Sequence, residues 1–237
     1  MVKPSSKRMH AADRKEAIAG AAMGVFAAKG FARATTKDLA HAADVSEGLI
    51  YRHFESKDEL YESIQNAICE ADAPYIRGLN SREPSVETLV LVIYTMHALI
   101  LECDETVAGV RQVILRLMIQ SILEDGEFIK SFHDSRMAVL LPIFKKSAEL
   151  ARANGEMVDN GLRDEERFWF THHTAVTLAL GCAPPTEPFD YGSGNFASRC
   201  WNGFLFSLRG IGLTDETIQK HADPMILGRA ADELLAD

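Results

Sequence analysis

The sequence predicts an all-α protein, and three observations support this fold class. Apolar residues recur at helical spacing along most of the chain, as Ile18, Ala22, Val25 and Phe26 do in the first segment. Capping residues precede these segments and glycines such as Gly30 follow them. No convincing run alternates apolar and polar residues as a half-buried strand would. At 237 residues the chain can bury a sizeable core.

The same spacing places the individual helices in order. We expect long or short helices over residues 12–29, 36–43, 46–54, 57 to about 71, 82–103, 105–124, 127–154, 163–180 and 195–209, with two short ones after Gly212. Pro142 would kink or split the helix over 127–154. The Pro- and Gly-rich stretch 182–195 predicts a loop. Asp223 and Pro224 suit a helix start, with Asp as the cap and Pro in the first turn.

Three of these segments are short, close together and capped. Thr36, Ser46 and Ser56 can each cap one helix, and Ser56 with Glu59 has the spacing of a capping box. Two short capped helices joined by a turn of about three residues form the helix-turn-helix that places a helix in the major groove. The apolar or small residues that would lock the two helices together are Leu39, Ala40, Val45 and Ile50.

Charge and cysteine content bound the class of protein further. The formal net charge is −9, yet residues 1–60 hold ten Lys/Arg against eight Asp/Glu, and the acidity lies in residues 61–237. An acidic protein can still bind DNA through a locally basic face. The four cysteines are scattered, which favours reduced thiols and a cytoplasmic protein. We see no signal peptide, and the apolar run over 89–101 is too short to span a bilayer.

A family resemblance enters at residues 14–64. It is carried by FAAKGF at 26–31, by Thr36-x-Asp38-Leu39-Ala40, by VSxGxIYxHF at 45–54 and by SKxEL at 56–60. This combination resembles the TetR/AcrR family of bacterial one-component repressors. From about residue 70 onward only the helical architecture is similar. The family usually has Gly where this chain has Asp44, and Asp is among the few other residues that tolerate a positive φ.

The resemblance implies two domains, a DNA-binding domain over residues 1–58 and a ligand-binding and dimerisation domain over 59–237. Relatives use an aromatic pair on the recognition helix, matched here by Tyr51 and His53, against the sugar-phosphate backbone. Helix N-termini attract phosphate, and an arginine can read guanine. The expected DNA-contacting residues are Thr35, Thr36, Ser46, Glu47, Gly48, Tyr51, Arg52, His53 and Lys57.

The second domain is expected to hold a small-molecule effector and to pair with a second copy. Apolar side chains with a few embedded polar ones would line the ligand site: Tyr94, Met96, His97, Met118, Phe132, Phe144, Phe168 and His173. The helix over 195–209 is apolar on two faces, so one face is expected to meet a partner. The expected pairing residues are Trp169, His172, Val176, Phe196, Trp201, Phe204, Leu205 and Leu208.

These observations favour a ligand-responsive transcriptional regulator, most simply a repressor. It would bind a pseudo-palindromic double-stranded operator as a homodimer and be released by a small, largely apolar effector. We expect no catalytic residues, no cofactor, no metal site and no membrane partner. Adjacent histidines such as His172 and His173 point about a hundred degrees apart on a helix and would not share one ion. The alternatives are an all-α enzyme and an interaction protein that does not bind DNA.

Overall fold

The computed structural model describes residues 10–101, 105–181, 191–192 and 195–235, and at residues 105–112, 131, 132, 135 and 137 the main chain only. Over these ranges the secondary structure is helical, with one isolated β-bridge between Met157 and Leu213. The predicted all-α class is therefore confirmed.

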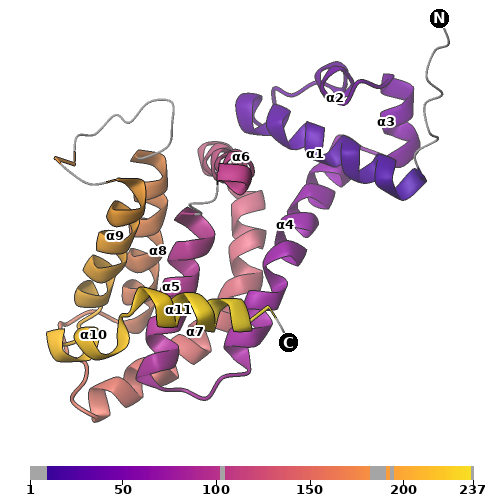
Figure 1. The fold of residues 1–237 in the computed structure, drawn as a ribbon. Coiled ribbons are helices and arrows are strands. Elements are labelled where there is room, and N and C mark those ends of the chain that lie inside the picture. Colours follow the sequence, from indigo (N-terminus) through magenta and orange to yellow (C-terminus); the bar gives the residue numbers. More distant parts are fainter. Residues whose placement is uncertain (1–9, 102–104, 182–190, 193–194, 236–237) are drawn as a thin grey trace, which may run out of the picture. The chain divides into compact units, whose positions relative to one another are not determined.

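The helices follow the predicted order along the chain (Figure 1). Their bounds are α1 Ala11–Lys29, α2 Thr36–Ala42, α3 Glu47–His53, α4 Lys57–Asn80, α5 Val86–Leu101, α6 Glu105–Leu123, α7 Glu127–Ala153, α8 Asp164–Gly181, α9 Phe196–Gly210, α10 Asp215–His221 and α11 Pro224–Glu233. As predicted, Asp223 caps α11 with its carboxylate, and Pro224 is the first residue of that helix. Most of the predicted loop over 182–195 lies outside the described residues.

The fourth helix is longer than the sequence predicts. It was expected to end near residue 71, before Pro74, but α4 continues through Pro74 to Asn80. Proline removes one main-chain hydrogen bond, and tertiary packing can outweigh that loss. Leu79 is buried in the core, and Gly78 packs so closely on Leu234 that a Cβ would lie 2.9 Å from a side-chain methyl carbon. Burial of this last turn therefore sustains the helix past the proline.

The chain forms two compact units. The amino-terminal unit contains α1 to α3, α4 as far as Ile68, and the segment Arg116–Lys130, in which α6 ends and α7 begins. The second unit contains Cys69–Leu115 and the chain from residue 131 onward. The predicted division between residues 58 and 59 lies at the start of α4, whereas the compact units divide α4 about ten residues later. The sequence did not predict that Arg116–Lys130, which we call the α6–α7 corner, belongs to the first unit.

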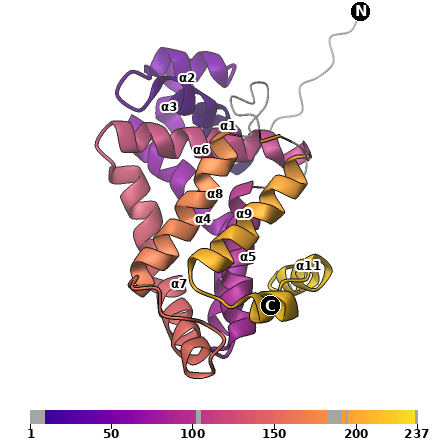
Figure 2. The ribbon, with the colours of Figure 1, turned by 90° about the vertical axis from the view of Figure 1, so that its left-hand side faces the viewer.

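The second unit is built around α5, which is buried on nearly every side. Helices α8, α9, α10 and α11 all contact α5, and α8 and α9 lie side by side (Figure 2). Phe144 of α7 and Phe168 of α8 meet edge to face in this core, with ring centroids 5.3 Å apart. Among the described helices, none combines the length and the apolar composition that crossing a bilayer requires.

Candidate functional site

The helix-turn-helix begins with a capping box one residue earlier than predicted. Thr35, not Thr36, is the N-cap of α2: its hydroxyl accepts from the Asp38 amide, and the Asp38 carboxylate accepts from the Thr35 amide at 3.1 Å. The Asp38 carboxylate also lies 2.7 Å from the ammonium of Lys29 at the end of α1. Lys29 and the two Thr35 donors hold the pKa of Asp38 far below its ordinary value.

Thr36 is left free of the capping role and meets the second helix instead. Its hydroxyl lies 3.0 Å from the Tyr51 hydroxyl, so α2 and α3 are joined by a hydrogen bond on their outer side. Tyr51 nevertheless keeps 57% of its surface exposed. The ring is therefore positioned by Thr36 and still available to a ligand.

The turn between α2 and α3 has the predicted strained residue. Asp44 has φ of 51°, the left-handed conformation in which the family usually has glycine. The Val45 amide closes the turn by donating to the Ala40 carbonyl at 3.0 Å. Leu39, Ala40 and Ile50 are buried beneath it, which confirms them as scaffold residues, while Val45 is half-buried.

Ser46 caps α3, as predicted, by accepting from the Leu49 amide. Six of the predicted DNA-contacting residues are exposed, namely Thr35, Ser46, Glu47, Gly48, Tyr51 and Arg52, and three are half-buried, namely Thr36, His53 and Lys57. Gly48 has open space where a Cβ would stand, so the α3 main chain can be approached closely there. Apart from Thr35, which caps α2, the exposed residues lie at the start and on the outer side of α3.

Lys57 has partners inside the unit. Its ammonium donates to the carbonyls of Phe31 at 2.8 Å and Ala34 at 3.2 Å, and it lies 4.2 Å from the centre of the Phe31 ring. These contacts brace the loop between α1 and α2, which ends at the cap of α2. The predicted contact of Lys57 with DNA phosphate stays a prediction.

The α6–α7 corner also contacts the loop between α1 and α2. The Glu124 carboxylate accepts from the Phe31 amide at 3.1 Å. Tyr61 packs between the rings of Phe31 and Phe128, with centroid distances of 4.9 and 4.6 Å. Burial, followed by the charges of Glu124 and Asp125, raises the pKa of Tyr61. Sequence reasoning missed Glu124 and Phe128, because no local pattern marks contacts between residues this far apart in the sequence.

The predicted effector residues do not come together at one site. Met96, Phe144 and Phe168 are buried in the core of the second unit, whereas Met118 belongs to the amino-terminal unit. The side chain of Phe132 lies outside the described residues. Tyr94 and His97 line one cavity, between α5 and α9, and His173 lines another, between α8 and α9.

His97 is a buried histidine with a protein partner. Its Nε2 lies 3.2 Å from the Ser207 hydroxyl of α9. Its Nδ1 approaches the Thr171 main chain without the geometry of a good hydrogen bond. Burial lowers the pKa of His97 to about 4, so its imidazole is neutral at pH 7.

A group of aromatic and imidazole rings lies further along α8. His133 of α7 packs edge to face on Trp169 and His172, with centroid distances of 5.1 and 4.9 Å. Burial lowers the pKa of both histidines, to about 4 for His133 and about 3 for His172. Within the described residues no group of three or more His, Cys, Asp or Glu side chains could hold a metal ion. The three rings of His133, Trp169 and His172 pack against one another.

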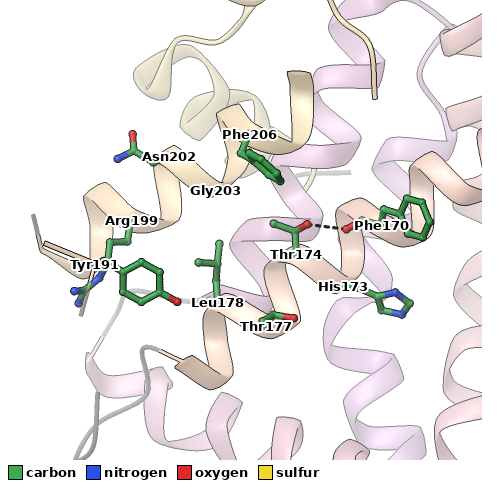
Figure 3. Close-up of a pocket in the computed structure, with 10 residues that line it drawn as sticks. All are labelled: Phe170, His173, Thr174, Thr177, Leu178, Tyr191, Arg199, Asn202, Gly203 and Phe206. Carbon is green, nitrogen blue, oxygen red and sulfur yellow. Dashed lines mark hydrogen bonds between the residues drawn. The ribbon is translucent and has the colours of Figure 1, made fainter. Parts of the chain in front are cut away.

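The outer sides of α8 and α9 form an open groove of about 660 Å³, shown in Figure 3. We call this the α8–α9 groove; its lining residues are Phe170, His173, Thr174, Thr177, Leu178, Tyr191, Arg199, Asn202, Gly203 and Phe206. Phe170 and Phe206 are 54% and 67% exposed. The groove therefore presents two large apolar side chains at the surface.

None of the residues predicted for pairing is among those that line this groove. Phe204 and Leu208 are buried inside one chain, so their assignment to an exposed pairing face is corrected. The remaining six, Trp169, His172, Val176, Phe196, Trp201 and Leu205, are half-buried. Sequence reasoning recognised that α9 is apolar on two faces but included residues of both faces among the pairing residues.

Residues 18–64 match the model of the bacterial regulatory proteins of the tetR family, a span that contains the helix-turn-helix. The chain is 27% identical over 160 residues to the nucleoid occlusion factor SlmA of Actinobacillus pleuropneumoniae, which covers 57% of this chain and 79% of that protein. It is 28% identical over 166 residues to the SlmA of Haemophilus ducreyi, covering 60% and 81%.

Solved structures agree over a larger part of the chain. A regulatory protein of the tetR family from Rhodococcus RHA1 superposes with a TM-score of 0.63 at 18% identity, covering 85% of this chain and 98% of that one. FadR from Bacillus subtilis, solved in complex with stearoyl-CoA, gives 0.54 at 19% identity, covering 83% and 98%. The amino-terminal domain of this chain therefore matches the tetR family of bacterial regulatory proteins, and the chain as a whole shares the fold of solved proteins of that family.

Proposed function

We propose that this chain is a ligand-responsive repressor that binds a pseudo-palindromic DNA operator as a homodimer. The observation that supports this most directly is the exposed outer side of α3. There Tyr51, held by Thr36, stands beside Arg52 and the open main chain at Gly48. A short helix that presents polar and aromatic groups in this way suits the major groove.

The residues of this face would contact different parts of the DNA. Tyr51, Thr36 and the free amides at the start of α3 would position the unit on sugar and phosphate, and Arg52 would contact a base edge or a phosphate. Lys57 would act chiefly through the loop that it braces, because two of its three donors are used inside the chain.

Pairing is required because one helix-turn-helix offers few contacts. A two-fold dimer presents two recognition helices to two half-sites, and its operator mirrors that symmetry. The α8–α9 groove, with Phe170 and Phe206 exposed, is the surface that we assign to pairing. Tyr191 and Arg199, whose guanidinium lies 5.5 Å from the Tyr191 ring centre, would form its rim.

Release by a small molecule would follow from a two-state equilibrium of the dimer. The effector must bind the DNA-free arrangement more tightly than the DNA-bound one, and a coupling of about 1–3 kcal/mol would lower operator affinity roughly 5- to 150-fold. The structural similarity to FadR, which was solved with an acyl-CoA, supports an effector that binds in the second unit.

Selection of genomic fragments by the purified full-length chain tests this proposal. We expect enrichment of fragments that share an inverted repeat, with binding that weakens as salt rises. Equal binding of host promoters and scrambled duplexes at every salt concentration, in the absence of any small molecule, would overturn it and leave the interaction protein as the better interpretation.

Arg52→Ala refines the test once a site is selected. If Arg52 contacts phosphate, the slope of log affinity against log salt falls by about 0.9; if it contacts a base, discrimination at one base pair falls by about 1–3 kcal/mol. Arg116→Ala is the matched control, an exposed arginine of the same unit on α6. Unchanged slope and discrimination in Arg52→Ala would remove Arg52 from the interface.

A further inference from the structure

A cavity separate from the α8–α9 groove lies between α5 and α9. Its volume is about 260 Å³. Its wall includes Tyr94, His97 and Ala98 of α5 and Ala197, Trp201 and Phe204 of α9. We call it the α5–α9 slot. Its volume suits a molecule of one or two rings rather than a long chain, since drug-sized ligands occupy pockets of about 300 Å³ or more.

The wall of the slot is a set of rings that meet Phe204 from three directions. Tyr94 and His97 pack edge to face on it, with centroid distances of 5.6 and 6.0 Å, and Trp201 lies tilted against it at 5.1 Å. Aromatic rings prefer such edge-to-face neighbours, and a further planar ring entering the slot would extend the same packing.

The described wall of the slot carries no formal charge at neutral pH. Among the described residues that line it there is no Lys, Arg, Asp or Glu. Its one titratable imidazole, His97, has a pKa lowered to about 4 by burial, and its Nε2 lies within hydrogen-bond distance of Ser207. A charged group brought into this slot would lose hydration without gaining a counter-charge, which is costly. An uncharged ligand would meet no such cost.

We infer that the α5–α9 slot binds a small, planar, uncharged aromatic molecule, and that this class of molecule is the effector of the regulator. The role of this molecule as an effector rests on the proposed function. Its binding in the slot rests only on the cavity and the residues that line it.

Helix α9 gives the slot a route to the pairing surface. Ala197 and Phe204 face the slot, whereas Gly203 and Phe206 face the α8–α9 groove, so one helix is the wall of both. At Gly203 the helix approaches Leu178 of α8 so closely that a Cβ there would collide with that side chain. A ligand that widens the slot would therefore displace α9 relative to a tightly packed neighbour and change the groove on its other side.

Calorimetric titration of the full-length chain with two probes tests the ligand class. The probes p-cresol and p-toluate share a methylated ring and differ in carrying a hydroxyl or a carboxylate. We expect saturable binding of p-cresol and at least about tenfold weaker binding of p-toluate, because burying the carboxylate is unfavourable. Equal affinity of the two probes, or no binding of p-cresol, would overturn the inference.

Filling the slot tests the location. Ala98→Leu and Ala197→Leu place larger side chains at two exposed positions of the wall, and each should weaken p-cresol binding at least about tenfold. Ala71→Leu, an exposed alanine of α4 in the same unit, is the matched control and should bind as the unsubstituted chain does. Unchanged affinity in both slot variants would place the ligand elsewhere and overturn the inference.

A measurement on the unsubstituted chain avoids dependence on variants that could misfold. Cys200 also lines the slot, so bound p-cresol should slow its alkylation by iodoacetamide at least about threefold, read by peptide mass spectrometry, while Cys69 of α4 reacts at an unchanged rate. Unprotected Cys200 at saturating p-cresol would contradict binding in the slot.

The effector role has its own readout. Saturating p-cresol should lower operator affinity at least about fivefold in the unsubstituted chain and leave it unchanged in Ala197→Leu. If p-cresol binds in the slot but operator affinity does not change, the effector role is overturned. If the chain binds no operator while p-cresol still protects Cys200, the proposed function fails and the slot remains.

Discussion

At the scale of single residues, Asp38 holds the start of α2 through three donors on two neighbours. Its carboxylate accepts from the Thr35 hydroxyl at 2.8 Å and from the Thr35 amide, and it pairs with the Lys29 ammonium. All three contacts favour the ionised carboxylate, which is why the pKa of Asp38 is lowered. The position of Thr36, and through it Tyr51, depends on this start.

The lowered pKa predicts how stability changes with pH. A carboxyl whose pKa is lower in the folded state stabilises that state above its unfolded pKa, near 3.8 here, and the contribution is lost as pH falls toward the folded pKa. The difference in unfolding free energy between the unsubstituted chain and Asp38→Asn should therefore be largest near pH 7 and shrink below about pH 4, measured by urea unfolding.

The control for this prediction is Asp58→Asn, an exposed carboxyl in the first turn of α4. It changes the net charge equally without touching the α2 cap. A difference for Asp38→Asn that stays constant from pH 7 to pH 3 would contradict the role of the ionised carboxylate.

Residue-scale features were predictable only where the sequence pattern is unambiguous. Ser46 was predicted as a cap and is one, whereas the cap of α2 fell on Thr35 because two adjacent threonines fit the same pattern. The role of Lys57 was not predictable, because its partners are main-chain carbonyls of Phe31 and Ala34 that no residue type encodes.

At the scale of elements, the turn between α2 and α3 carries strain at Asp44. A non-glycine residue at φ of 51° costs roughly 1–2 kcal/mol, less for Asp than for most types, and glycine adopts this conformation freely. Asp44→Gly should therefore raise the free energy of unfolding by about 0.5–1 kcal/mol, measured by urea denaturation.

Asp44→Ala is the companion variant, because alanine keeps a Cβ but lacks the side-chain oxygens that favour this conformation in Asp. It should be less stable than the unsubstituted chain. Stability in the order Ala above Gly would show that backbone strain does not limit this turn.

Element boundaries followed from the sequence where local signals acted alone. The ends of α1, α2, α3 and α9 lie within one or two residues of their predicted positions. The start of α5 lies four residues after its predicted position, at Val86. The largest departure is the end of α4, because its last turn is sustained by burial of Leu79 and by the contact between Gly78 and Leu234, which are distant in sequence. The α6–α7 corner likewise reaches Phe31 through Glu124, a contact that only the folded chain reveals.

At the scale of the whole molecule, the choice of outer face on α9 decides how two copies could pair. A helical wheel identifies two apolar stripes on α9 but cannot tell which stripe covers the chain's own core. The structure buries Phe204 and Leu208 and leaves Phe206 exposed. A test of pairing therefore belongs at Phe206, since a charge at Phe204 would disturb the core instead.

Phe206→Asp should separate the proposed dimer without unfolding the chain. Burying a phenylalanine contributes about 1.5–3 kcal/mol, and a two-fold interface loses that contribution twice, so the dimer dissociation constant should rise at least about 100-fold. Sedimentation velocity at micromolar protein should then report a monomer, with circular dichroism still helical, and operator affinity should fall with the loss of the second recognition helix.

Met225→Asp is the matched control, because Met225 of α11 is exposed to the same 67% and lies outside the groove. A Phe206→Asp chain that still sediments as a dimer would exclude the α8–α9 groove as the pairing surface, whereas dissociation of both variants would point to a general effect of added charge.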